Sequence, residues 1–323
     1  MGYFMFDKRR LAGDDILPSL SPRYDSCHSC HSCLIIETRI MLTLTPRAET
    51  VEGQPILRPL PSARCRSVGP FVFFDHMLAT DYPPGTGMDI RQHPHIGLST
   101  LTYLLEGELQ HKDSLGSDQC VKAGDVSWMT SGAAIAHIER TPEPLRVSGS
   151  RLHGLQVWLA SPRDHEQGEG HYSHHPAHSL PQSDSMGIFI RMLAGNGFGL
   201  QSPVPVLSDT LYAEIRLQTA TTLAIEPEHQ ERALYVLEGE AALDGTPVLP
   251  CTLVVLEPGT TVNLCAESEC HVVLIGGAAL DGPRRMNWNF VASEAALIED
   301  ARRRWADGDW PTVPGETGRI ELP

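Results

Sequence analysis

Four residues in the first half of the chain have the types and spacing of a metal site. His93 and His95 are one residue apart in "QHPHIGLSTLTYLLEGE", and His137 and Glu139 repeat that spacing in "AHIERT". Residues two apart on a β-strand point to the same face, so each pair presents two side chains to one side of a sheet. Together they offer three imidazoles and one carboxylate, which can complete the protein ligands of one divalent transition metal.

The ligand types restrict the metal without selecting it. Imidazoles suit Fe, Mn, Ni, Cu or Zn, and a carboxylate with open coordination positions favours Fe(II), or Mn, over a closed tetrahedral zinc site. One His-x-His pair is weak evidence in a chain with 15 histidines. The second pair at the same spacing makes a set of solvated strand residues the poorer interpretation.

Short strand-like runs must position these residues. Between about 70 and 160 they alternate with turn signals and leave almost no room for helix, which predicts a sandwich or barrel. The run "LTYLLEGE" at 101–108 recurs as "ALYVLEGE" at 233–240. Such internal similarity predicts two related β-modules in tandem.

The chain divides into four segments. We expect a disordered tail at 1–40, a first barrel with the metal site at 41–165, a polar linker at 166–182, and a second barrel without metal at 183–323. The second barrel should end in one amphipathic helix, capped by Ser293, with apolar residues at four-residue spacing: Leu297, Ala301 and Trp305.

Two other stretches, one rich in cysteine and one rich in histidine, are weaker candidates for a metal site. Cys27, Cys30 and Cys33 have residue types that bind zinc, but no second ligand pair follows at finger distance, so a leader outside the fold is the favoured interpretation. The histidines between His171 and His178 are expected on a solvated linker rather than at a metal site.

Composition excludes several classes of partner. Forty acidic and 25 basic residues give a net charge of -15, which repels phosphate backbones and anionic lipid, so no direct nucleic-acid partner is expected. No stretch approaches the roughly 18 apolar residues of a membrane span, and the first 40 residues lack the apolar block of a secretory signal. We expect a cytoplasmic protein that does not contact membranes.

The motifs and their order resemble the pirin family. The resemblance covers about 41–315 and rests on "FVFFDHM", "HPHIGLSTLTYLLEGELQHKDSLGS", "VKAGDVSWMTSGAAIAHIERT", "LHGLQVWLASP" and "NWNFVAS". It implies an all-β fold of two tandem cupin-type (jelly-roll) β-barrels, with one metal, usually iron, in the N-terminal barrel. Matched residue by residue, the implied metal ligands are His93, His95, His137 and Glu139. Ser99 stands where cupins commonly carry another Glu, which concerns tuning of the site more than metal binding.

The second module lacks the ligands. Placing Tyr235 on Tyr103 puts Ile225 and Pro227 where His93 and His95 stand. A second local alignment brings Leu264 and Ala266 onto His137 and Glu139. The C-terminal barrel is therefore expected to support the fold or to wall the site.

Two classes of function remain open at this point. The resemblance implies an enzyme similar to quercetin 2,3-dioxygenase, with a small phenolic flavonol and dioxygen as substrates. In that reaction we expect Glu139 to double as the base that takes the proton of the 3-hydroxyl group. The enzyme is the favoured interpretation, and the alternative is a non-catalytic regulator in which the metal senses redox state and controls contact with a protein partner. A third alternative is a metal-binding cupin that acts on another phenolic compound or on a small acid. Gln156 and Trp158 share a strand face in "LHGLQVWLA". The Gln156 amide could hydrogen-bond a ligand histidine or the substrate, and a hydrogen-bonded core residue is an equally good interpretation.

Overall fold

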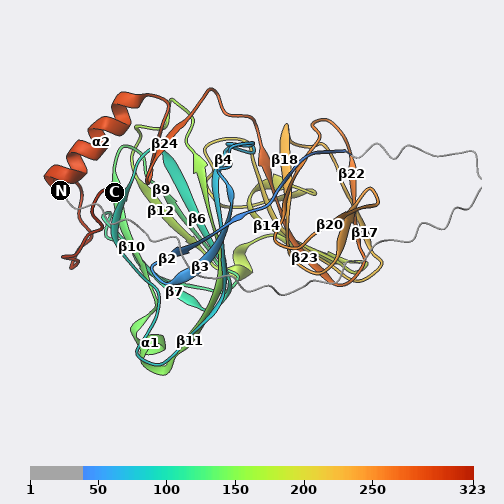
Figure 1. Cartoon of the computed structure of the whole chain (residues 1–323), viewed down its shortest axis with the longest axis horizontal. Helices are drawn as coiled ribbons and strands as arrows, with labels where there is room; N and C mark the ends of the chain where they lie inside the picture. The colour runs from blue at the N-terminus through green and yellow to red at the C-terminus, as the bar shows by residue number, and fades with distance from the viewer. Residues whose placement is uncertain (1–38) are drawn as a thin grey trace, which may run out of the picture. The chain divides into compact units, whose positions relative to one another are not determined.

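The structure is a computed structural model that describes residues 39–323, and these form two β-modules and a C-terminal helix (Figure 1). Residues 1–38 of the expected tail, with its three cysteines, lie outside the described residues. The last residue assigned to the tail, Ile40, begins strand β1. Each module combines a larger and a smaller antiparallel sheet in a jelly-roll-like arrangement. The all-β class is confirmed, although the sheets do not close into barrels.

The N-terminal module contains the predicted metal ligands. Its larger sheet has the order β12-β9-β6-β11-β4-β3-β2. The strands are β2 (Arg47–Val51), β3 (Gln54–Leu60), β4 (Phe71–Tyr82), β6 (Leu98–Glu106), β9 (Val126–Thr130), β11 (Ser150–Ala160) and β12 (His171–His175). Its smaller sheet consists of β5 (Asp89–His95), β10 (Ile135–Arg140), β7 (Glu108–Asp113) and β8 (Asp118–Lys122), in that order.

The C-terminal module repeats this plan. Its larger sheet contains β1 (Ile40–Leu44), β21 (Leu253–Leu256), β18 (Glu231–Glu238), β23 (Cys270–Gly277), β16 (Thr210–Leu217), β14 (Ile188–Gly197), β13 (Gln182–Ser185) and β15 (Leu200–Gln201). Its smaller sheet contains β17 (Thr222–Ile225), β22 (Val262–Ala266), β19 (Ala241–Leu243) and β20 (Thr246–Val248).

Helical structure is sparse in the described residues. A short helix, α1 (Glu143–Ser148), and a 3-10 turn (Ala177–Ser179) lie in connections, and β24 (Arg285–Asn287) pairs with β25 (Phe290–Ala292) before the long helix α2 (Ala295–Asp307). The predicted C-terminal helix is thus present, but Glu294 rather than Ser293 is its N-cap. The Ser293 hydroxyl and amide instead donate hydrogen bonds to the carboxylate of Glu166.

Alternation along the strands separates two environments in the N-terminal module. On β10, Ala136 and Ile138 contact the apolar cluster of the C-terminal segment, whereas His137 and Glu139 point to the opposite face. On β11, Leu155 and Val157 belong to the core shared by both modules. The polar side chains that alternate with these apolar ones, His137 and Glu139 on β10 and Gln156 on β11, therefore project into the space between the two N-terminal sheets.

The C-terminal module has an apolar interior. Ile225, Leu264 and Ala266, which align with three of the predicted metal ligands, are at most 3 % exposed and pack in an aliphatic core. Buried carbon side chains at these positions offer no donor atoms to a metal ion.

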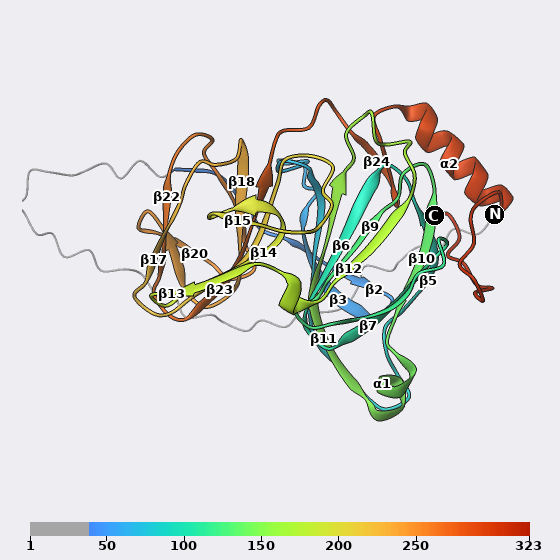
Figure 2. The ribbon, with the colours of Figure 1, turned by 180° about the vertical axis from the view of Figure 1, so that it is seen from behind.

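The segments at the two ends of the described chain cross between modules. Strand β1 pairs with β21 of the C-terminal module, although the sequence placed residues after 41 with the first barrel. The end of the chain returns to the N-terminal module, where α2 lies beside β5 and β10 (Figure 2). Trp305 and Trp310 of this segment are buried in one cluster with Ile96 and Ile138. The outer face of the metal-ligand strands is thereby covered.

The segment expected to be a linker also contributes to the fold. Residues 171–175 form β12, which pairs with β9 at the edge of the larger N-terminal sheet. Its polar composition suggested a surface connection, but backbone pairing to a sheet edge does not need an apolar sequence.

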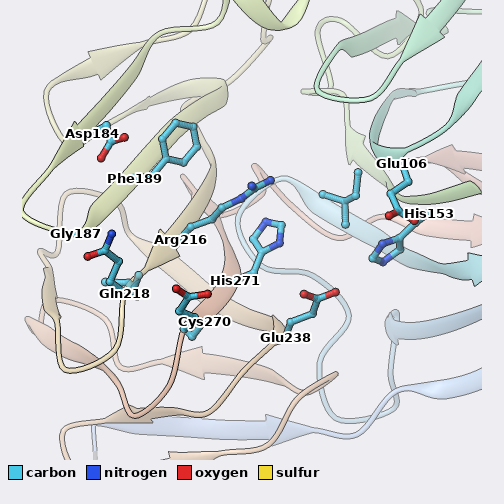
Figure 3. Close-up of a pocket in the computed structure, with 13 residues that line it drawn as sticks. Glu106, His153, Asp184, Gly187, Phe189, Arg216, Gln218, Glu238, Cys270 and His271 are labelled. Carbon is cyan, nitrogen blue, oxygen red and sulfur yellow. The ribbon is translucent and has the colours of Figure 1, made fainter.

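The two modules share a polar cleft of about 460 Å³ (Figure 3). Glu106 and His153 line it from the N-terminal module, and Arg216, Glu238 and His271 from the C-terminal module. The Nε2 atom of His153 is 2.8 Å from that of His76, whose Nδ1 is 3.1 Å from the Tyr235 hydroxyl. The cleft is therefore on the face of the larger N-terminal sheet that contacts the other module.

Candidate metal centre

Three of the four predicted ligands form a close, buried group. One ring nitrogen from each of His93, His95 and His137 lies within 4.8 Å of the other two. The three side chains are between 1 and 6 % exposed. Pairing of β5 with β10 produces this group, because His93 is directly opposite His137 and His95 is opposite Ile135.

The outer nitrogens of the three rings have partners. Nδ1 of His93 donates to the carbonyl oxygen of Arg91 at 2.9 Å, and Nδ1 of His95 donates to that of Asn289 at 3.1 Å. Nδ1 of His137 lies 3.4 Å from Nδ1 of His111. In His93 and His95 the Nε2 atom therefore keeps its lone pair, which is the form that binds metals.

Burial keeps these imidazoles neutral. It lowers the pKa of His93, and it lowers the pKa values of His95 and His137 well below the ordinary value, with a further decrease from neighbouring histidines. For His93 the nearby carboxylate of Glu139 acts in the opposite direction. Neutral rings are the required state for metal binding at neutral pH.

Glu139 lies beside the group but does not belong to it. Its carboxylate accepts hydrogen bonds from the Gln156 amide at 2.9 and 3.0 Å and from the Thr102 hydroxyl at 3.1 Å. The residue is 5 % exposed. The structure thus brings the three histidines together and places the carboxylate next to them, held by side chains of the facing sheet.

Other residues selected from the sequence have varied environments. Trp158 is edge-on to His95, with ring centroids 5.2 Å apart, and it is stacked on Phe73. The Gln156 amide donates to Glu139 and not to a histidine of the triad. The Ser99 hydroxyl is 2.9 Å from that of Thr130.

Sequence reasoning missed four residues that surround the histidines. They are His111 and Asp113 on β7, Tyr172 on β12, whose ring stacks on His111 at 4.3 Å, and Asn289, whose carbonyl oxygen accepts from His95. A signal for the first two was present, because "HKD" repeats the two-residue spacing of the ligand pairs. The sequence gives no signal for the carbonyl of Asn289, because every residue has a backbone carbonyl.

The donor set suits a divalent transition metal. The Nε2 atoms of His95 and His137 are 3.0 Å apart. Two ring nitrogens bound at right angles to one ion, each at about 2.1 Å, would lie roughly 3 Å apart. Buried nitrogen lone pairs this close repel each other unless a proton or a cation lies between them, so the arrangement fits a shared ion.

Comparison with known proteins agrees with the fold, which is that of a two-module cupin. The pattern of the pirin family matches residues 53–159, and that of the pirin C-terminal cupin domain matches residues 212–311. A pirin-like protein of Caulobacter vibrioides is 40 % identical over 288 residues, which are 88 % of this chain and 96 % of that protein. The chain belongs to the pirin family.

Solved structures extend the comparison. The crystal structure of quercetin 2,3-dioxygenase from Acinetobacter baumannii has a TM-score of 0.81 and 30 % sequence identity, covering 88 % of this chain and 95 % of that chain. A bacterial pirin from Escherichia coli in complex with nickel(II) has a TM-score of 0.59 and 17 % identity, covering 74 % and 99 %. At that identity the second likeness supports the fold alone. Among residues 39–323, no helix is both long and apolar enough to cross a bilayer.

Proposed function

We propose that this protein is a metal-dependent dioxygenase that opens flavonols such as quercetin at a mononuclear site formed by His93, His95, His137 and Glu139. The observation that carries the proposal is the buried triad of neutral imidazoles with a carboxylate beside it. The likeness to a quercetin 2,3-dioxygenase supports the reaction and the substrate class. Fe(II) is the metal we favour, because the ligand set suits redox-active ions.

Each residue has a distinct task in this proposal. The three imidazoles and the Glu139 carboxylate are the proposed ligands of the ion, which when bound would stabilise the flavonol oxyanion and provide redox chemistry with dioxygen. Glu139 also takes the proton of the 3-hydroxyl group. Gln156 and Thr102 orient its carboxylate by donating hydrogen bonds to it. Trp158 forms an apolar wall beside His95.

Replacing the proposed base tests this assignment. We expect Glu139→Gln to lower the rate of quercetin loss roughly 10²- to 10⁴-fold, because the amide cannot accept the substrate proton. The measurement is the decrease of flavonol absorption in air, with the protein loaded in turn with Fe(II), Mn(II), Ni(II), Cu(II) or Zn(II).

The matched control is Glu106→Gln, which alters an exposed carboxylate paired with Arg151 and should leave turnover unchanged. Equal rates for Glu139→Gln and the native protein would remove Glu139 from the reaction. If no metal supports turnover while metal still binds, the result would favour the partner-binding regulator instead.

A further inference from the structure

A buried carboxylate fixes the proton of His111. Asp113 is 0 % exposed, and its Oδ1 accepts hydrogen bonds from the backbone amides of Leu115 and Ser117 at 2.9 and 3.0 Å. Its Oδ2 is 3.1 Å from Nε2 of His111. Because an ionised carboxylate only accepts hydrogen bonds, Nε2 of His111 must carry the hydrogen.

The tautomer of His111 determines the tautomer of His137. A neutral imidazole with hydrogen on Nε2 has a lone pair on Nδ1. In His111 this lone pair faces Nδ1 of His137 at 3.4 Å, so His137 must carry its own hydrogen on Nδ1. Its Nε2 is then a bare donor atom, 3.0 Å from Nε2 of His95.

The ring of His111 is also held in place. It is 4 % exposed and lies flat against Tyr172 of β12, with an interplanar angle of 10°. The Tyr172 hydroxyl is 3.1 Å from that of Ser127 on the neighbouring strand. The stack limits rotation of His111 away from His137.

We propose that His111, held by Asp113, is a positioning residue that fixes the tautomer of His137 and thereby sets the affinity of the triad for a divalent metal. The proposal rests on the metal site proposed above. Groups that hydrogen-bond to the outer ring nitrogen of a metal-ligating histidine have this effect in general, and losing such a partner typically costs about 10- to 100-fold in metal affinity.

His137 is the suitable target, because it is the one histidine of the three whose Nδ1 faces a side chain rather than a backbone carbonyl. Backbone carbonyls orient His93 and His95, and no side-chain substitution removes those directly. The influence of His111 can therefore be changed without altering any of the four proposed ligands.

Two variants test the chain of hydrogen bonds. His111→Leu removes the acceptor for His137. In Asp113→Asn the amide oxygen should keep the two backbone hydrogen bonds, so the NH₂ group of the new side chain faces Nε2 of His111. Because this group donates, the hydrogen of His111 should move to Nδ1, where it faces the hydrogen on Nδ1 of His137. We expect both to bind Ni(II) roughly 10- to 100-fold more weakly in competition with a chelator.

A second readout needs no metal. Long-range ¹H–¹⁵N spectra of the metal-free protein distinguish the two neutral tautomers of histidine. We expect hydrogen on Nδ1 of His137 in the native protein and a mixed or reversed state in Asp113→Asn. His111→Gln, whose amide oxygen can still accept from His137, should restore most of the Ni(II) affinity.

The matched control is His174→Leu. His174 forms another histidine–carboxylate pair in the same module, with Asp125 at 2.9 Å, and its loss should leave Ni(II) affinity unchanged. Affinities of His111→Leu and Asp113→Asn within twofold of the native value would overturn the proposal, as would an unchanged His137 tautomer in Asp113→Asn. If His111→Leu does not fold, Asp113→Asn and His111→Gln decide the matter.

The outcomes separate this proposal from the proposed function. A native protein that binds no divalent metal would contradict the metal site itself. The tautomer of His137 in the metal-free protein would still show whether His111 and Asp113 position it.

Discussion

The His95→Ala variant should lose specific metal binding while remaining folded. His95 provides one of three neutral nitrogen donors, and its Nε2 is 3.0 Å from that of His137. Removing a direct ligand should reduce affinity by more than the roughly 10- to 100-fold typical of a supporting residue. Elemental analysis of protein purified without added metal, followed by titration against a chelator, measures the change.

Thermal unfolding gives an independent measure of the same loss. A metal present at 100 times its dissociation constant stabilises the native protein by about 2.7 kcal/mol, and this gain should vanish in His95→Ala. His171→Ala is the control, because His171 is an exposed histidine on β12. The site proposal fails if His95→Ala and His171→Ala retain equal metal content and equal stabilisation.

The local part of the site was predictable from sequence because strand geometry is local. The two-residue spacing of His93 with His95, and of His137 with Glu139, requires only that each segment be a strand. The structure supplies the remaining condition, which is the pairing of β5 with β10 across 42 positions. Only the family resemblance indicated that these two strands would be neighbours.

Long-range contacts explain what the sequence did not predict. Residues 40–44 are recognisable as a strand, but their sequence does not say which sheet edge they join, and they pair with β21 of the other module. His111 and Asp113 stand two residues apart like the ligands, yet their role depends on the register of β7 against β10. The two-residue period determines which face of its own strand a residue takes, but it does not determine which distant strand is the partner.

A buried acidic residue at the module interface was also missed. Glu214 on β16 is 0 % exposed, and its carboxylate accepts from the Tyr103 hydroxyl of the N-terminal module at 2.6 Å. Arg216 donates at 2.7 and 3.0 Å, His271 lies at 2.9 Å and Arg191 at 3.5 Å. This network contributes to the junction between the modules.

Removing that carboxylate should destabilise the protein strongly. We expect Glu214→Ala to lower the free energy of unfolding by about 3–5 kcal/mol, because it leaves the buried Tyr103 hydroxyl and the largely buried His271 and Arg191 without their acceptor. Urea unfolding at pH 7 measures the loss. Glu269→Ala alters an exposed carboxylate at the same cleft and should change stability by no more than about 0.5 kcal/mol. A similar value for both variants would show that the network is energetically unimportant.

The contribution of Glu214 should depend on pH in a defined direction. Burial alone would raise its pKa, but the His271 imidazole 2.9 Å away, with Tyr103 and Arg216, lowers the pKa to about 2 from the ordinary 4.5. Since the folded-state pKa is the lower one, the stabilisation is complete above about 4.5 and is lost as the pH falls toward 2. The stability difference between the native protein and Glu214→Gln should therefore shrink by on the order of 3 kcal/mol over that range. A difference that stays constant or grows on acidification would mean that the carboxylate is not preferentially ionised in the folded protein.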